Sequence, residues 1–84
     1  MVLWTIYVLP TEESEVKAIE IDSEQTFSAF RTKVSNAINV NFNDLLITGK
    51  EEYNASFNSK KLSEINGIYD QCTLFAVYQV GGGK

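Results

Sequence analysis

Hydrophobic and polar residues alternate with two different periods along the chain, and the change of period separates strands from a helix. Residues 3–9 are rich in β-branched and aromatic side chains and predict a first strand. Alternation places Trp4, Ile6 and Val8 on one face and Thr5, Tyr7 and Leu9 on the other. Residues 10–15 are polar and predict a hairpin turn, and residues 16–21 predict a second strand with Ile19 and Ile21 inward. The short connection favours antiparallel neighbours.

Residues 27–38 follow a helical period instead. The apolar stripe consists of Phe27, Phe30, Val34, Ala37 and Ile38. Thr26 is the predicted N-cap, and Asn36 and Asn39 favour termination. Arg31 and Lys33 are expected to point away from the stripe. Because a helix of roughly twelve residues does not persist alone in water, it is expected to pack on a sheet.

The second half of the chain predicts two more strands. Residues 44–48 form the third strand, with Gly49-Lys50 as its turn, and residues 73–80 form the last one, with Leu74 and Ala76 inward. Between them, residues 51–61 are polar and irregular, with Tyr53 and Phe57 as anchors, and residues 62–68 predict a short helical turn closed by Asn66-Gly67. This order predicts an α+β domain in which a mixed sheet of four to five strands packs on one α-helix. The first and last strands are expected to be parallel neighbours.

The outward positions of the last two strands are unusually apolar. Phe75, Val77 and Gln79 are expected to face outward on the last strand, and Leu46 on the third. If the two strands are neighbours, Leu46, Phe75 and Val77 form a contiguous apolar patch of the kind that marks a partner-binding site. The alternative is that single exposed apolar residues need no functional explanation.

The chain ends in Gly81-Gly82-Gly83-Lys84. Because glycine loses more backbone freedom on folding than any other residue, the folded domain is expected to comprise residues 1–80 and the tail residues 81–84. Such a tail can thread a narrow channel and present a carboxylate to another protein. It can equally be a flexible linker or a cloning remnant.

Composition excludes several classes of function. The chain of 84 residues is expected to be one monomeric domain, and its net charge of −4 disfavours nucleic-acid binding. It has no histidine, so a His-based triad, a His general base and a metal site are not expected. Neither an enzymatic activity nor a cofactor is expected. Its one cysteine, Cys72, cannot form an internal disulfide, which suits the cytoplasm or the nucleus. The apolar stretch at residues 2–9 is too short to span a membrane.

Three stretches of the chain resemble ubiquitin and its relatives. Thr26-Phe27 with Phe30 and Val34 is similar to the family's helix start, and residues 44–50 are similar to its third strand and Gly-Lys turn. Residues 73–83 resemble its last strand and diglycine tail, and residues 62–66 its preceding turn. The resemblance implies a β-grasp fold.

The resemblance also implies a protein modifier. A processing protease would cut the precursor after Gly83, and activating and conjugating enzymes would transfer the terminal glycine to lysines of target proteins. Gly83 would be the conjugated residue and Gly82 its neighbour, while Lys50 matches a lysine used for chains. Leu46, Phe75, Val77 and Gln79 would contact domains of the kind that bind ubiquitin.

Several residues differ from those of ubiquitin, and these differences limit what the resemblance implies. Gln79 and Gly81 stand where ubiquitin has arginines, which implies a different or relaxed activating enzyme. Asp70 replaces another chain-forming lysine, Lys17 replaces an apolar residue, and residues 51–61 form a longer loop. Lys84 is expected to begin a propeptide or a following domain, or to be a cloning remnant.

Two other functions remain open at this point. One is a ubiquitin-like domain that docks to partners without conjugation. The other is a sulfur carrier, which ranks lower because such carriers end at the diglycine and usually lack the Gly49-Lys50 turn.

Overall fold

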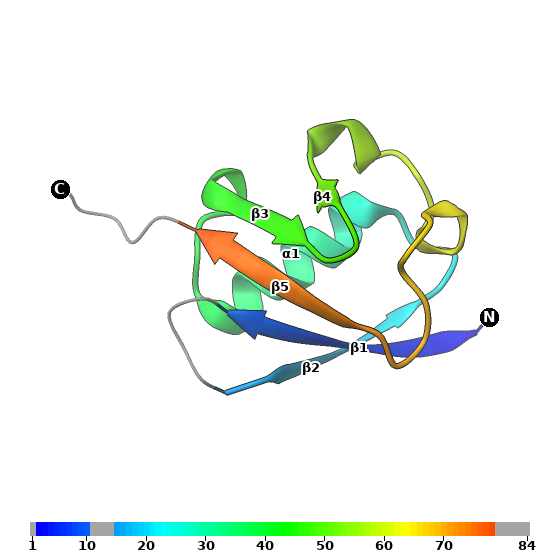
Figure 1. Cartoon of the computed structure of the whole chain (residues 1–84), viewed down its shortest axis with the longest axis horizontal. Coiled ribbons are helices and arrows are strands. Elements are labelled where there is room, and N and C mark those ends of the chain that lie inside the picture. The colour runs from blue at the N-terminus through cyan, green and yellow to red at the C-terminus, as the bar shows by residue number, and fades with distance from the viewer. Residues whose placement is uncertain (1, 11–14, 79–84) are drawn as a thin grey trace, which may run out of the picture.

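The computed structural model describes residues 2–10 and 15–78. Its strands are β1 (Leu3–Pro10), β2 (Lys17–Asp22), β3 (Leu45–Thr48), β4 (Glu52–Tyr53) and β5 (Thr73–Tyr78). The α-helix is α1 (Phe27–Ile38), and three short 3₁₀ helices are η1 (Phe42–Asp44), η2 (Ala55–Phe57) and η3 (Leu62–Glu64). The helix lies across one face of the sheet, and no element within residues 2–10 and 15–78 covers the other face (Figure 1). This is the α+β arrangement that the sequence predicts.

The five strands form one mixed sheet in the order β2-β1-β5-β3-β4. β1 and β5 are parallel, with Tyr7 opposite Thr73, and this confirms the predicted pairing of the first and last strands. The other three pairs are antiparallel. β5 therefore occupies the centre of the sheet although it is the last strand along the chain, and it carries Phe75 and Val77 between two neighbours.

The ends of α1 follow from its sequence. The hydroxyl oxygen of Thr26 accepts from the amide of Ala29 at 3.2 Å, so Thr26 is the N-cap as predicted. At the other end Asn39 is in the left-handed conformation, with φ of 59°, and its amide donates to the carbonyl of Ser35. Asparagine tolerates this conformation better than most residues, which explains why the helix stops there.

The stripe of α1 differs from the prediction at two positions. Phe27, Phe30, Val34 and Ile38 are buried, but Ala37 is exposed. Arg31 was expected to point away and is instead only 7% exposed. The reason is angular, because each residue turns the helix by about 100°. Arg31 therefore lies about 40° round from Phe27, inside the buried stripe, whereas Ala37 falls at its margin.

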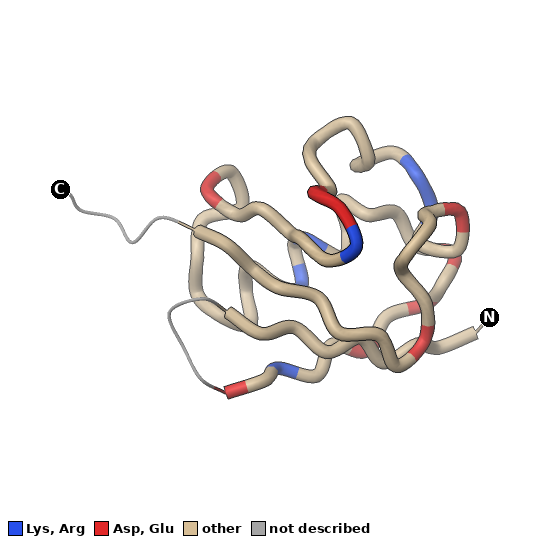
Figure 2. The backbone as a smooth tube through the Cα atoms, in the orientation of Figure 1, with Lys and Arg blue, Asp and Glu red and all other residues tan. Residues whose placement is uncertain are grey.

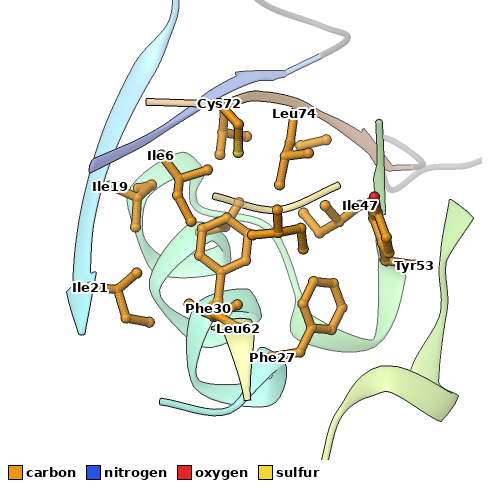
Figure 3. Packing of buried hydrophobic residues seen from close by; sticks show 14 of the residues in the cluster. Ile6, Ile19, Ile21, Phe27, Phe30, Ile47, Tyr53, Leu62, Cys72 and Leu74 are labelled. Carbon is orange, nitrogen blue, oxygen red and sulfur yellow. The ribbon is translucent and has the colours of Figure 1, made fainter. Parts of the chain in front are cut away.

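Aromatic rings fill the space between α1 and the β3–β4 end of the sheet (Figure 3). Phe27 lies 6.0 Å from both Phe30 and Tyr53, measured between ring centroids, and Tyr53 meets the edge of Phe57 at 5.3 Å. The buried Tyr53 satisfies its hydroxyl by donating to the carbonyl of Asn66 at 3.0 Å. Tyr53 and Phe57 are thus the anchors that the sequence predicts for residues 51–61.

Other boundaries are corrected by the structure. Residues 51–61 are not wholly irregular, since they contain β4 and η2. Pro10 belongs to β1 and is buried, because the strand continues beside Ala76 of β5 instead of turning. Val16 lies outside β2 and is exposed, and Asp44 belongs to η1. The helical turn at residues 62–68 reduces to η3, with Gly67 after it at a φ of 96°. Residues 11–14 of the predicted hairpin turn lie outside the described residues.

No helix within residues 2–10 and 15–78 is long and apolar enough to cross a membrane.

Candidate protein-interaction face

Leu46 and Val77 are direct neighbours on the uncovered side of the sheet. They are paired across β3 and β5, and the next outward pair on these strands is Thr48 with Phe75. Phe75 is 43% exposed and Val77 is 39% exposed, while the inward Leu74 and Ala76 are buried. Leu46 is half-buried. The structure therefore brings Leu46, Phe75 and Val77 together into one apolar patch.

Leu9 extends this patch onto β1, which the sequence did not predict. It pairs with Phe75 in the parallel register, so both side chains lie on the uncovered side. The alternation of residues along β1 predicts that Leu9 faces outward. Which residue of β5 lies beside Leu9 depends on the register of the two strands. That register is set by pairing between segments more than sixty residues apart, and a local pattern does not contain it.

The remaining predicted site residues fall in two groups. Lys50 is exposed in the turn that follows β3, and the base of its side chain lies beside Gly67, since a Cβ added at Gly67 would be 3.2 Å from that of Lys50. Gln79, Gly82 and Gly83 lie outside the described residues, as do Gly81 and Lys84. The last described residue of β5 is Tyr78, so the predicted boundary of the domain at residue 80 also lies outside the described residues.

Arg31 holds the strand that carries Leu46. Its guanidinium donates to the carbonyl oxygens of Leu45 at 2.8 Å and Phe42 at 3.1 Å, and to the side-chain oxygen of Asn58 at 3.0 Å. The guanidinium also lies over the Phe42 ring, 4.2 Å from its centroid. Burial lowers the pKa of Arg31 from its ordinary value, but a guanidinium remains charged throughout the range of stable proteins. One buried cation thereby fixes η1 and the start of β3 to α1.

Cys72 has the surroundings of a structural thiol. It is buried immediately before β5, and burial is the main reason that the pKa of its thiol is raised. A raised pKa lowers the thiolate fraction and hence the nucleophilicity at neutral pH. Within the part of the chain that the structure describes, no group of three or more His, Cys, Asp and Glu side chains could hold a metal ion. A shallow depression between β2 and α1 is lined by Ala18, Ile19 and Glu20 of the strand and by Lys33, Asn36 and Ala37 of the helix.

Solved structures identify this fold, although comparisons of sequence alone do not. No protein-family model and no curated protein matches the sequence. Among solved structures, Caldiarchaeum subterraneum ubiquitin superposes with a TM-score of 0.79 over 96% of this chain and 99% of that one, at 19% identity. The chain has the ubiquitin-like β-grasp fold.

Two further ubiquitin-like structures are similar. An N-terminal ubiquitin-like domain solved in solution gives a TM-score of 0.77 at 16% identity, over 98% of this chain and 80% of that one. A chain in the crystal structure of a pParkin–pUb–UbcH7 complex gives a TM-score of 0.76 at 12% identity over 92% of this chain. This chain spans 23% of the length of that one. The ubiquitin-like fold thus occurs among these neighbours both as nearly a whole chain and as part of a longer one.

Proposed function

We propose that this chain is a ubiquitin-like protein modifier that is not itself an enzyme. Its precursor is processed after Gly83, and Gly83 is then joined to lysine amines of target proteins. The observation that carries the proposal is the position of the apolar patch on β5, the strand that leads directly into the glycine run. A partner docked on Leu46, Phe75 and Val77 lies close to Tyr78, the last described residue before the tail.

The chemistry of this function needs only the carboxylate that processing exposes. Water cleaves the Gly83–Lys84 peptide bond in a protease, and ATP converts the Gly83 carboxylate to an acyl adenylate with release of pyrophosphate. A cysteine thiol of an activating enzyme displaces AMP to give a thioester, which passes to a conjugating enzyme. A lysine amine then attacks the thioester carbonyl, forming an isopeptide bond and releasing the thiol. Apart from water and ATP, every reactive group other than the terminal carboxylate belongs to another protein, in the cytoplasm or nucleus.

The second candidate is a ubiquitin-like domain that docks without conjugation. It is favoured by the neighbour of which this chain covers only 23%, because there the fold is one part of a longer chain. The apolar patch would serve this role unchanged, and the glycines would then be a linker. A sulfur carrier, with a thiocarboxylate at Gly83, is the third and least favoured candidate.

One experiment separates the three functions. The protein ending at Gly83 is incubated with cell extract and ATP, and the products are analysed by mass spectrometry. The matched control ends at Gly81, which keeps the folded domain and removes Gly82 and Gly83. Isopeptide adducts that need ATP and are absent from the control are the expected result. A thiocarboxylate mass would indicate the sulfur carrier.

The sequence dictates how such adducts must be detected. No Lys or Arg lies between Lys61 and Lys84, so trypsin would leave residues 62–83 on the modified lysine. Cleavage by chymotrypsin after Tyr78 leaves only residues 79–83, which is a convenient remnant. If neither digest contains adducts, and deletion of residues 81–84 leaves partner binding unchanged, the modifier is excluded in favour of the docking domain.

A further inference from the structure

β2 is an edge strand, and its outer row of backbone groups is unpaired. In the sheet order β2-β1-β5-β3-β4 it has β1 on one side and no described strand on the other. The amide of Ser23 donates to the carbonyl of Val2 at 2.8 Å, which makes these two residues a hydrogen-bonded pair. Because such pairs alternate along an antiparallel ladder, Ala18 and Glu20 occupy non-hydrogen-bonded positions. Their amide and carbonyl groups therefore point away from β1.

The hydrogen bonds of β1 lead to the same assignment. The amide of Tyr7 donates to the carbonyl of Cys72 at 2.9 Å, and the carbonyl of Thr5 accepts from the loop before β5 at 2.8 Å. These two residues of β1 lie opposite Ala18 and Glu20. Their backbone groups are thus directed toward β5. No hydrogen bond between described residues engages the backbone of Ala18 or Glu20.

The shallow depression between β2 and α1 lies along this unpaired edge, and we call it the β2–α1 depression. Its strand wall is the stretch from Ala18 to Glu20, and its helix wall consists of Lys33, Asn36 and Ala37. The volume is about 380 Å³, within the range of about 300–1,000 Å³ that is usual for ligand pockets. The three helix residues are exposed, so no described side chain closes the space between the strand edge and the helix.

We infer that this edge binds an extended segment of another protein, which adds a strand to the sheet beside β2. A row of unpaired donors and acceptors is matched by a second extended backbone. Successive side chains of a strand point to opposite faces, so every second side chain of the bound segment enters the β2–α1 depression. There it meets Ile19 and Ala37, and it is therefore apolar. The alternate side chains lie beside Ala18 and Glu20 on the uncovered side of the sheet.

The backbone match, and not charge, selects the segment. The β2–α1 depression has one charged side chain of each sign, Glu20 and Lys33. Figure 2 shows both signs along β2 as well. The net charge of −4 opposes pairing with a second copy of the chain, which favours a different protein as the partner. β1 separates β2 from β5, so this site is distinct from the apolar patch and does not depend on the proposed modifier function.

Selection from a random peptide library tests the inference. Peptides of about ten residues, long enough for one strand, are selected on the protein and counter-selected on Glu20→Pro. Proline lacks an amide hydrogen and is tolerated in an edge strand where that amide faces solvent, so the change removes a free donor but no bond to β1. We expect peptides with alternating apolar residues, whose dissociation constant is about 10-fold or more higher for Glu20→Pro. Glu20→Gln keeps the amide and should bind like the wild type.

A second set of variants approaches the site from the helix and leaves β2 unchanged. Ala37→Arg fills the β2–α1 depression and should weaken binding of the same peptides, and it replaces Glu20→Pro in the counter-selection if that variant does not fold. Ala55→Arg, at an exposed alanine of η2, is the matched control and should bind like the wild type. Phe75→Ala/Val77→Ala should also bind like the wild type. Loss of binding in this last variant would assign the peptides to the apolar patch and overturn the inference.

Amide hydrogen exchange followed by NMR distinguishes strand addition from contact through side chains alone. The amides of Ala18 and Glu20 should exchange about 10-fold more slowly at a free peptide concentration of about ten times the dissociation constant. The amide of Ile19, which is already bonded to β1, should change little. Peptides that leave Ala18 and Glu20 unprotected, or no enrichment over the counter-selected variant, would overturn the inference. Protection that appears without peptide and rises with protein concentration would identify a second copy as the occupant and overturn it too. ATP-dependent adducts test the modifier function separately.

Discussion

The guanidinium of Arg31 donates to the carbonyl oxygen of Leu45 at 2.8 Å, and so ties the helix to the strand whose next residue is Leu46. Arg31→Ala leaves the buried carbonyl of Leu45 and the part-buried carbonyl of Phe42 without this donor. An unsatisfied buried acceptor costs about 1–3 kcal/mol, and a part-buried one costs less because water reaches it. We expect unfolding free energy to fall by about 2–4 kcal/mol in urea denaturation. Arg31→Lys replaces the two guanidinium nitrogens that donate here by a single ammonium nitrogen, so its stability should lie between those of the wild type and of Arg31→Ala. A loss below about 0.5 kcal/mol would mean that this network does not support β3.

Leu46→Ala and Val77→Ala should separate binding from stability. Both side chains are on the uncovered side of the sheet, so each change is expected to cost less than about 1 kcal/mol of unfolding free energy while weakening partner binding. The inward Leu74→Ala on the same strand is the control and should cost about 2–5 kcal/mol. Thermal melts measure the effect on stability, and the dissociation constant of a partner bound to the patch measures the effect on binding. A large fall in melting temperature for Val77→Ala would place that side chain in the core.

Phe30→Ala removes a ring that is fully buried between α1 and the sheet and lies 6.0 Å from Phe27. The expected loss is about 3–5 kcal/mol, as for other buried aromatic residues. Phe30→Leu keeps most of the volume and should lose clearly less. Equal losses in denaturant titrations would argue that ring packing is not the cause.

Gly67 is constrained by its backbone and by Tyr53. Its φ of 96° disfavours any side chain, and an added Cβ would overlap the Tyr53 hydroxyl. Gly67→Ala should therefore destabilise by about 1–3 kcal/mol, whereas Asn66→Ala next to it should be near neutral because only the Asn66 carbonyl is used. The double change Tyr53→Phe/Gly67→Ala removes the overlapping oxygen, so its loss should be smaller than the sum of the two single losses. If the loss of the double variant equals the sum of the two single losses, the methyl group added at residue 67 does not clash with the Tyr53 hydroxyl.

Stability should fall at alkaline pH. Burial is the main cause of the raised pKa of both Cys72 and Tyr53 in the folded protein. Above the ordinary pKa of a thiol, about 8.5, the unfolded chain releases a proton that the folded chain retains, so unfolding becomes more favourable as pH rises. Tyr53 adds a second decline above about 10. Denaturation at pH 7 to 9.5 should show the first decline in the wild type and a flatter profile in Cys72→Ala. If the wild type and Cys72→Ala show the same dependence of stability on pH, groups other than Cys72 cause the decline.

The hydrophobic pattern of the sequence predicts the buried positions correctly where burial follows from the repeat of a strand or of a helix. Alternation placed Leu74 and Ala76 inward on β5, and the helical period placed Phe27, Phe30 and Val34 against the sheet. Thr26 and Asn39 marked the ends of α1 because their side chains and backbone preferences act within one turn.

The features that the sequence did not predict correctly have a different cause. Arg31 was assigned to solvent by its charge, but three oxygens from segments far along the chain satisfy it in the interior. β4 is only two residues long, and its pairing with β3 follows from a tight connection rather than from a period. Leu9 joined the patch through its register with β5. Each of these depends on contacts distant in sequence, which a local pattern does not encode.

The central place of β5 has a consequence for synthesis. Because the last strand inserts between β1 and β3, a chain stopped before Thr73 has two separate strand pairs and no continuous sheet. We expect such a truncated chain to lack the cooperative thermal transition of the full domain when followed by circular dichroism. On the ribosome, the domain would remain incomplete until β5 has left the exit tunnel, so folding would report that all five strands of the sheet have been synthesised.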